Sequence, residues 1–97
     1  MDALVNAFLQ HLVVEKGFST NTLEAYRNDL TQFHEYVEEQ QNYSTDQGIQ
    51  WDAIDITLLN AYISDLRNRR GYRDTTTARK IASVKSLLLY SIRLGGS

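Results

Sequence analysis

The sequence predicts an all-α protein that folds as a four-helix bundle. The 97 residues contain no proline and only five glycines, so few positions force a break in a helix. Apolar residues recur at helical spacing in four segments, and no segment shows the alternation expected of a strand. The connections are short, which favours an up-and-down or orthogonally packed bundle with helices over residues 3–15, 20–39, 57–70 and 75–93.

The two helices of the first half have clear start and stop signals. The first is expected to end at Gly17, and its apolar stripe consists of Leu4, Val5, Phe8, Leu9 and Leu12. Ser19 or Asn21 can cap the second helix, because both side chains accept hydrogen bonds from the unpaired N–H groups of a first turn. The apolar stripe of the second helix consists of Leu23, Tyr26, Leu30, Phe33 and Val37.

The second half opens with a polar stretch without periodicity, residues 40–48, which predicts a loop. Trp51 follows, and we expect it in the core or at the rim of the core. Thr57 can cap the third helix, which ends at Gly71 and faces inward with Leu59, Tyr62, Ile63 and Leu66. Thr75 can cap the fourth helix, whose inner face is predicted to be Ile81, Val84, Leu87, Leu88 and Ile92.

Several functional classes find no support in the sequence. There is no cysteine, and His11 and His34 fall on different helices and form no metal-binding or catalytic motif. We therefore expect no catalytic residue, no metal, no cofactor and no small-molecule substrate. No apolar run approaches the ~18 residues of a membrane span, and the N-terminus does not resemble a signal peptide. These observations predict a cytoplasmic protein without membrane contact.

The charges are distributed unevenly along the chain. The formal net charge is −2, which by itself argues against a nucleic-acid partner. Residues 1–66 carry eleven acids and two bases, however, whereas residues 67–97 carry eight bases and one acid. Such an asymmetry predicts a strongly positive surface on a mildly acidic domain.

Two stretches are candidates for binding phosphate, and the larger runs from Arg67 to Lys85. Within it, Thr75–Thr77 open a helix, whose N-terminus exposes N–H groups and carries partial positive charge. We interpret this stretch as a DNA-binding surface. The alternatives are a solvated basic face and, for Arg67, Arg69 and Arg70, partners of a helix dipole. The second candidate is the hydroxyl cluster at the start of the second helix, followed by Arg27, although such a cluster alone is more often only a cap.

Two sequence patterns resemble the tyrosine recombinases of the phage-integrase type. The first, over residues 19–30, is Ser-x2-Thr-x3-Tyr-Arg-x-Asp-Leu, and the second, over residues 75–84, is Thr-x3-Arg-x4-Val. Together they are similar to the N-terminal core-binding, SAM-like domain of the Xer-type recombinases. The resemblance covers nearly the whole chain, and the two patterns are more specific as a pair than either is alone.

The resemblance implies that residues 1–94 form a SAM-like domain, one half of a C-shaped clamp around a recombination site in double-stranded DNA. Residues 95–97 would then be a flexible tail or the start of a linker. The second and fourth helices of such a clamp face the major groove and the adjacent phosphates. The DNA-binding residues implied are Ser19, Thr20, Asn21, Thr22, Tyr26, Arg27, Thr75, Thr76, Thr77, Arg79, Lys80, Ser83 and Lys85, to which the basic stretch adds Arg73.

Tyr26 also lies on the predicted apolar stripe, so we expect its ring in the core and its hydroxyl group at the surface.

The catalytic residues of the family belong to a C-terminal domain that this chain lacks, so the resemblance implies DNA binding without cleavage. Other recombinase subunits are expected partners of the full-length protein. The alternative is a helical protein–protein module whose basic face meets an acidic partner. An enzyme is a third alternative, for which the sequence offers no pocket of perturbed titratable groups.

Overall fold

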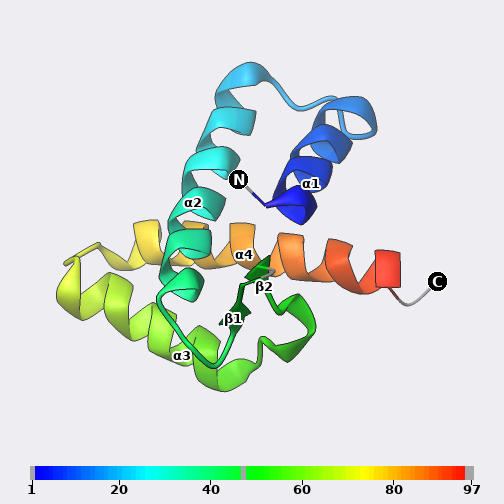
Figure 1. Cartoon of the computed structure of the whole chain (residues 1–97). Coiled ribbons are helices and arrows are strands. Elements are labelled where there is room, and N and C mark those ends of the chain that lie inside the picture. The colour runs from blue at the N-terminus through cyan, green and yellow to red at the C-terminus, as the bar shows by residue number, and fades with distance from the viewer. Residues whose placement is uncertain (1, 47, 96–97) are drawn as a thin grey trace.

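The computed structural model of the chain describes residues 2–46 and 48–95. Four α-helices dominate it, as the sequence predicts, and Figure 1 shows their arrangement. The elements in chain order are α1 (Ala3–Val14), α2 (Thr20–Glu38), β1 (Ser44–Thr45), β2 (Gly48–Ile49), the 3₁₀ turn η1 (Trp51–Ala53), α3 (Ile56–Ser64), the π-helical turn η2 (Asp65–Arg69) and α4 (Asp74–Gly95).

Helices α2 and α4 form the frame of the molecule. Figure 1 shows α2 crossing α4, with α1 packed beside both of them. The chain of α3 and η2 turns back at Gly71, where φ is +71°, and α4 then returns along it. Glycine adopts a positive φ without steric strain, which is why Gly71 marks the end of this helix in the sequence.

Two hydrophobic clusters fill the interior, and both depend on α2 and α4. The first lies between α2, α3, η2 and α4 and is built around Phe33, Val37, Leu58, Tyr62, Leu66 and Val84. The second lies between α1, α2 and α4 and is built around Val5, Phe8, Leu9, Leu12, Leu30 and Leu87. The predicted stripes of the first two helices are thereby confirmed, except that Leu4, Leu23 and Tyr26 are only half-buried.

The predicted inner faces of the last two helices need correction. Leu58 is buried although it was not predicted, and the predicted Leu59, Ile63 and Leu88 are only half-buried. Ile92 is 66% exposed, because it lies two residues beyond Tyr90 and therefore on nearly the opposite side of α4. Tyr90 is the residue that faces α1, where its ring centroid lies 5.0 Å from that of His11.

The helix starts differ from the expected ones at two of three positions. Ser19 caps α2, because its Oγ accepts a hydrogen bond from the N–H of Thr22 at 3.3 Å. Asp55 caps α3 in place of the expected Thr57, with its Oδ1 accepting from the N–H of Leu58 at 3.0 Å. Helix α4 begins at Asp74, one residue before the expected cap.

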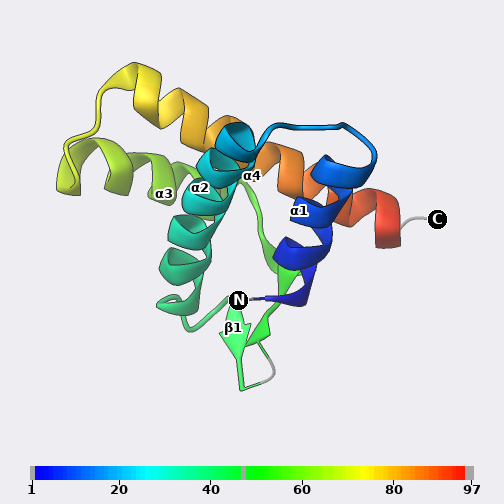
Figure 2. The ribbon, with the colours of Figure 1, turned by 90° about the horizontal axis from the view of Figure 1, so that it is seen from above.

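The expected loop at residues 40–48 contains a two-stranded antiparallel hairpin, in which Ser44 pairs with Ile49 and Thr45 with Gly48. The prediction of no strand is therefore wrong at this one place, because strands of two residues are too short to show alternation. Figure 2 shows the hairpin on the side of the molecule away from α4. Trp51, which follows it, is half-buried and packs against both clusters, as expected.

No helix within residues 2–46 and 48–95 is both long and apolar enough to cross a membrane. Of the tail expected at residues 95–97, only Gly95 belongs to the part of the chain that the structure describes, and it ends α4.

Candidate nucleic-acid interface

An open groove of about 420 Å³ lies between the first half of α2 and the first half of α4. It joins the two segments that the sequence analysis singled out, although they are some fifty residues apart in the chain. Helix α2 lines the groove with Asn21, Thr22, Ala25, Tyr26 and Asp29, and α4 lines it with Arg79, Ala82 and Ser83.

The start of α2 presents polar side chains at one end of the groove. Thr20 and Asn21 are exposed, and the hydroxyl groups of Ser19 and Thr22 are hydrogen-bonded to each other at 3.0 Å. Arg27 is exposed but lies elsewhere, because it lines a separate hollow with α1 and is paired with Glu24 at 3.4 Å. The structure therefore brings Asn21 and Thr22 to the groove, whereas Ser19, Thr20 and Arg27 do not line it.

Tyr26 forms one wall of the groove and also packs into the second hydrophobic cluster. Its ring centroid lies 6.2 Å from that of Phe8 and 5.7 Å from that of Phe18. The ring thus contributes to the core, as expected, and supports the α2 side of the groove.

The floor of the groove contains a buried carboxylate, Asp29, which holds three side chains of α4. Its Oδ1 accepts hydrogen bonds from Nη2 of Arg79 and from Nζ of Lys80, each at 3.0 Å. Its Oδ2 accepts from the hydroxyl group of Ser83, also at 3.0 Å. We call these four residues the Asp29 cluster. Hydrogen bonds between ionised partners are the strong ones, so the cluster ties α2 firmly to α4.

The Asp29 cluster separates the expected DNA contacts on α4 into two groups. Lys80, Ser83 and Thr77 are buried, and the polar atoms of Lys80 and Ser83 are engaged with Asp29. This inward orientation differs from the outward, DNA-facing one expected for Thr77, Lys80 and Ser83. The periodicity signal that could have found it is the spacing of Thr77, Lys80, Val84 and Leu87, which places all four residues on one face of the helix.

The second group remains at the surface. Arg73, Thr75, Arg79 and Lys85 are exposed, and Thr76 is half-buried. Within the described part of the chain, Arg73 and Lys85 form no ion pair, whereas Arg79 keeps 54% of its side chain exposed while it is bonded to Asp29. Unpaired or half-exposed cations of this kind remain available to an anionic partner.

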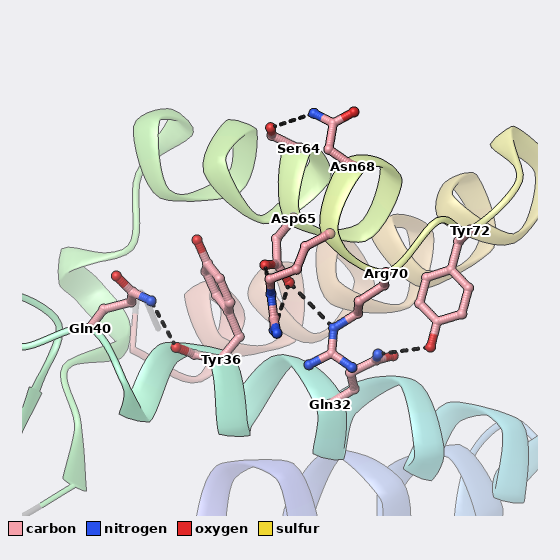
Figure 3. Close-up of polar contacts among 9 residues, drawn as sticks. Gln32, Tyr36, Gln40, Ser64, Asp65, Asn68, Arg70 and Tyr72 are labelled. Carbon is pink, nitrogen blue, oxygen red and sulfur yellow. Dashed lines mark hydrogen bonds and ion pairs between the residues drawn. The ribbon is translucent and has the colours of Figure 1, made fainter.

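The most basic run of the sequence, at the end of η2, is largely neutralised within the protein. Figure 3 shows the carboxylate of Asp65 bonded to Arg70, from whose Nε it accepts at 3.3 Å. The same carboxylate accepts from Nε of Arg69 at 2.5 Å. The hydrogen bond from Arg69 is the main reason that the pKa of Asp65 is lowered. Arg67 pairs in turn with Asp74 at 2.7 Å. The guanidinium groups of these arginines are therefore engaged by carboxylates of the protein itself.

Tyr72 connects this region to α2. Its hydroxyl oxygen accepts a hydrogen bond from Nε2 of Gln32 at 3.1 Å, which lowers the pKa of Tyr72, and Figure 3 shows the two side chains meeting across the helices. The ring of Tyr72 also lies 5.2 Å from Nζ of Lys80.

Among residues 2–46 and 48–95, no group of three or more His, Asp or Glu side chains could hold a metal ion.

The fold is an all-α SAM-like bundle, and the chain belongs to the family described as phage integrase, N-terminal SAM-like domain, whose family model matches residues 5–95. Tyrosine recombinase XerC of Roseiflexus castenholzii is 38% identical over 90 residues, which are 93% of this chain and 26% of that protein. Tyrosine recombinase XerD of Pasteurella multocida is 36% identical over 91 residues, 94% of this chain and 28% of that protein. The chain thus spans little more than a quarter of these relatives, and no solved structure matches it.

Proposed function

We propose that this chain is the DNA-binding clamp domain of a site-specific tyrosine recombinase and contacts duplex DNA through α2 and α4. The observation that carries the proposal is the groove between these helices. It combines exposed hydroxyl and amide groups at the start of α2 with the half-exposed guanidinium group of Arg79 on α4. Such groups are typical of contacts to DNA phosphates.

The outer face of α4 supports the same conclusion. Thr75, Ala78, Arg79, Ala82 and Lys85 are all exposed. Around the circumference of the helix, Ala78 and Ala82 lie between Arg79 and Lys85. Because alanine side chains are small, the helix backbone can approach a DNA strand closely while the two cations reach phosphates on either side. We place the contacts on the exposed subset of the expected residues, and we leave the buried Thr77, Lys80 and Ser83 out of direct contact.

The wider assignment rests on the relatives, which are named tyrosine recombinases. We propose that the chain binds DNA but does not cleave it, because the family match is to an N-terminal domain. Other recombinase subunits would be its partners in the full-length protein, in the cytoplasm.

The test measures the affinity of the chain for a mixed-sequence DNA duplex as a function of salt. With ~4–6 phosphate contacts, affinity should fall roughly 100-fold to 2,000-fold between 50 and 200 mM salt. The double variant Arg79→Ala/Lys85→Ala should bind more weakly and with a flatter salt dependence. Unchanged binding by the double variant would remove α4 from the interface. Retention of an acidic protein domain without any DNA binding would favour the protein–protein alternative.

A further inference from the structure

The Asp29 cluster contains two cations for one carboxylate, and the two cations differ in their access to solvent. Arg79 is 54% exposed at the groove, whereas Lys80 is 4% exposed and lies behind it. Both donate to the same oxygen atom, Oδ1 of Asp29, at 3.0 Å. With all three groups ionised, the cluster keeps a formal charge of +1, and the only part of that charge facing the groove is the guanidinium group.

The second cation matters because Asp29 would otherwise cancel the positive charge of Arg79. A carboxylate that holds an arginine in one orientation also cancels its charge, and a neutral pair attracts phosphate poorly. Asp29 is 1% exposed, so water screens its negative charge little and the carboxylate acts on the groove at low effective dielectric. A cation placed at equal distance on the buried side offsets that negative charge.

Lys80 cannot serve as a phosphate contact itself. Its ammonium group is buried between Asp29 and the ring of Tyr72, whose centroid is 5.2 Å from Nζ. A stabilising role alone would not require a lysine, because buried ion pairs commonly add no stability over apolar residues of similar volume. The feature that distinguishes lysine from an apolar residue here is its charge.

We propose that Lys80 is a buried charge compensator: it balances Asp29 so that Asp29 can fix the position of Arg79 without cancelling the charge that Arg79 offers to DNA. The proposal rests on the proposed function and deepens it, because it assigns positioning roles to Asp29 and Lys80 behind the contact made by Arg79. Neither residue touches DNA, and each acts through the guanidinium group.

The experiment compares the salt dependence of duplex binding for the parent chain, Lys80→Met and Asp29→Asn/Lys80→Met. Lys80→Met leaves Asp29 paired with Arg79 and Ser83, so the chain should fold, but the cluster becomes neutral. We expect weaker binding at 50 mM salt and a log–log salt slope that is smaller by about 0.9, as for the loss of one phosphate contact. The double variant restores the charge of +1 with an amide as acceptor, and it should recover the parent slope.

Arg69→Met is the matched control, because it also removes one of two cations from a shared carboxylate, Asp65, at a site outside the groove. It should leave the slope at the parent value. Circular dichroism confirms that each variant is folded. The inference is overturned if Lys80→Met binds duplex as tightly as the parent does, or if the double variant binds no more tightly than Lys80→Met. It is also overturned if Arg69→Met loses as much duplex affinity as Lys80→Met does. A parent chain that binds no duplex would instead overturn the proposed function, and this inference with it.

Discussion

Asp29 and Asp65 each hold two cationic side chains, but they do so in different surroundings and over different distances along the chain. Asp65 binds arginines four and five residues away, at the end of its own helical segment. Asp29 binds residues that are 50 and 51 positions away, on another helix. The cations of Asp65 are 62% and 33% exposed, whereas one of those of Asp29 is buried. The same composition therefore links near neighbours within one helical segment in one place and joins two helices in the other.

The largest effect should follow from removing the buried carboxylate. Asp29→Ala leaves Lys80 buried without an anionic partner, and breaking a buried pair in this way costs about 3–5 kcal/mol of unfolding free energy. Urea denaturation would measure it. Ser83→Ala is the control, because it removes a neutral hydroxyl donor shared between Asp29 and the carbonyl group of Arg79 and should cost only ~1 kcal/mol. A loss below ~1 kcal/mol for Asp29→Ala would mean that the cluster does not hold the helices together.

A smaller effect is expected from Asp65, whose arginine partners are more exposed than Lys80. Asp65→Ala breaks ion pairs whose arginines reach into solvent, and such pairs contribute about 0–1 kcal/mol. In 1 M salt, where the screening length is about 3 Å, the loss of unfolding free energy caused by Asp65→Ala should shrink further. The deficit of Asp29→Ala should persist, because salt reaches the buried cluster poorly. Equal sensitivity to salt in the two variants would contradict the contrast between them.

The smallest effect is a pH dependence at Asp65. Its pKa is lowered below the ordinary value of 3.8, chiefly by the hydrogen bond from Arg69. A lowered pKa means that the ion pairs contribute their full stability above the unfolded-state pKa and lose it as the pH falls through the folded-state pKa. The difference in unfolding free energy between the parent and Asp65→Asn should therefore be full well above pH 3.8, shrink as the pH falls below that value, and vanish below the lowered folded-state pKa. A difference that persists there would assign the stabilisation to packing instead of charge.

The local features of this fold were predictable, because they depend on neighbours in sequence. The four helices, the cap at Ser19 and the turn at Gly71 follow from periodicity and from the conformational preferences of single residues. The cap at Asp55 was missed because Thr57 is also a good capping residue and propensity alone does not choose between them. The hairpin was missed because two residues per strand carry no pattern.

The candidate site was predictable in outline and not in orientation. The two patterns located its segments, and the structure places Thr22, Tyr26 and Arg79 around one groove. The inward orientation of Lys80 follows the periodicity of α4, but its partner Asp29 lies 51 positions away and no local signal pairs the two residues. A lysine on a helix is normally interpreted as solvent-facing, and the packing of α2 against α4 supplies the buried carboxylate that reverses that interpretation.

The position of Trp51 gives the protein an intrinsic optical reporter. It is the single tryptophan of the chain, it packs against both hydrophobic clusters, and its Nε1 donates a hydrogen bond to Oδ1 of Asp2 at 3.2 Å. The indole thus senses solvent entry from either side and the detachment of the first residues. Its emission should follow the opening of either cluster, so that fluorescence without any attached label can establish whether the two halves of the interior melt together.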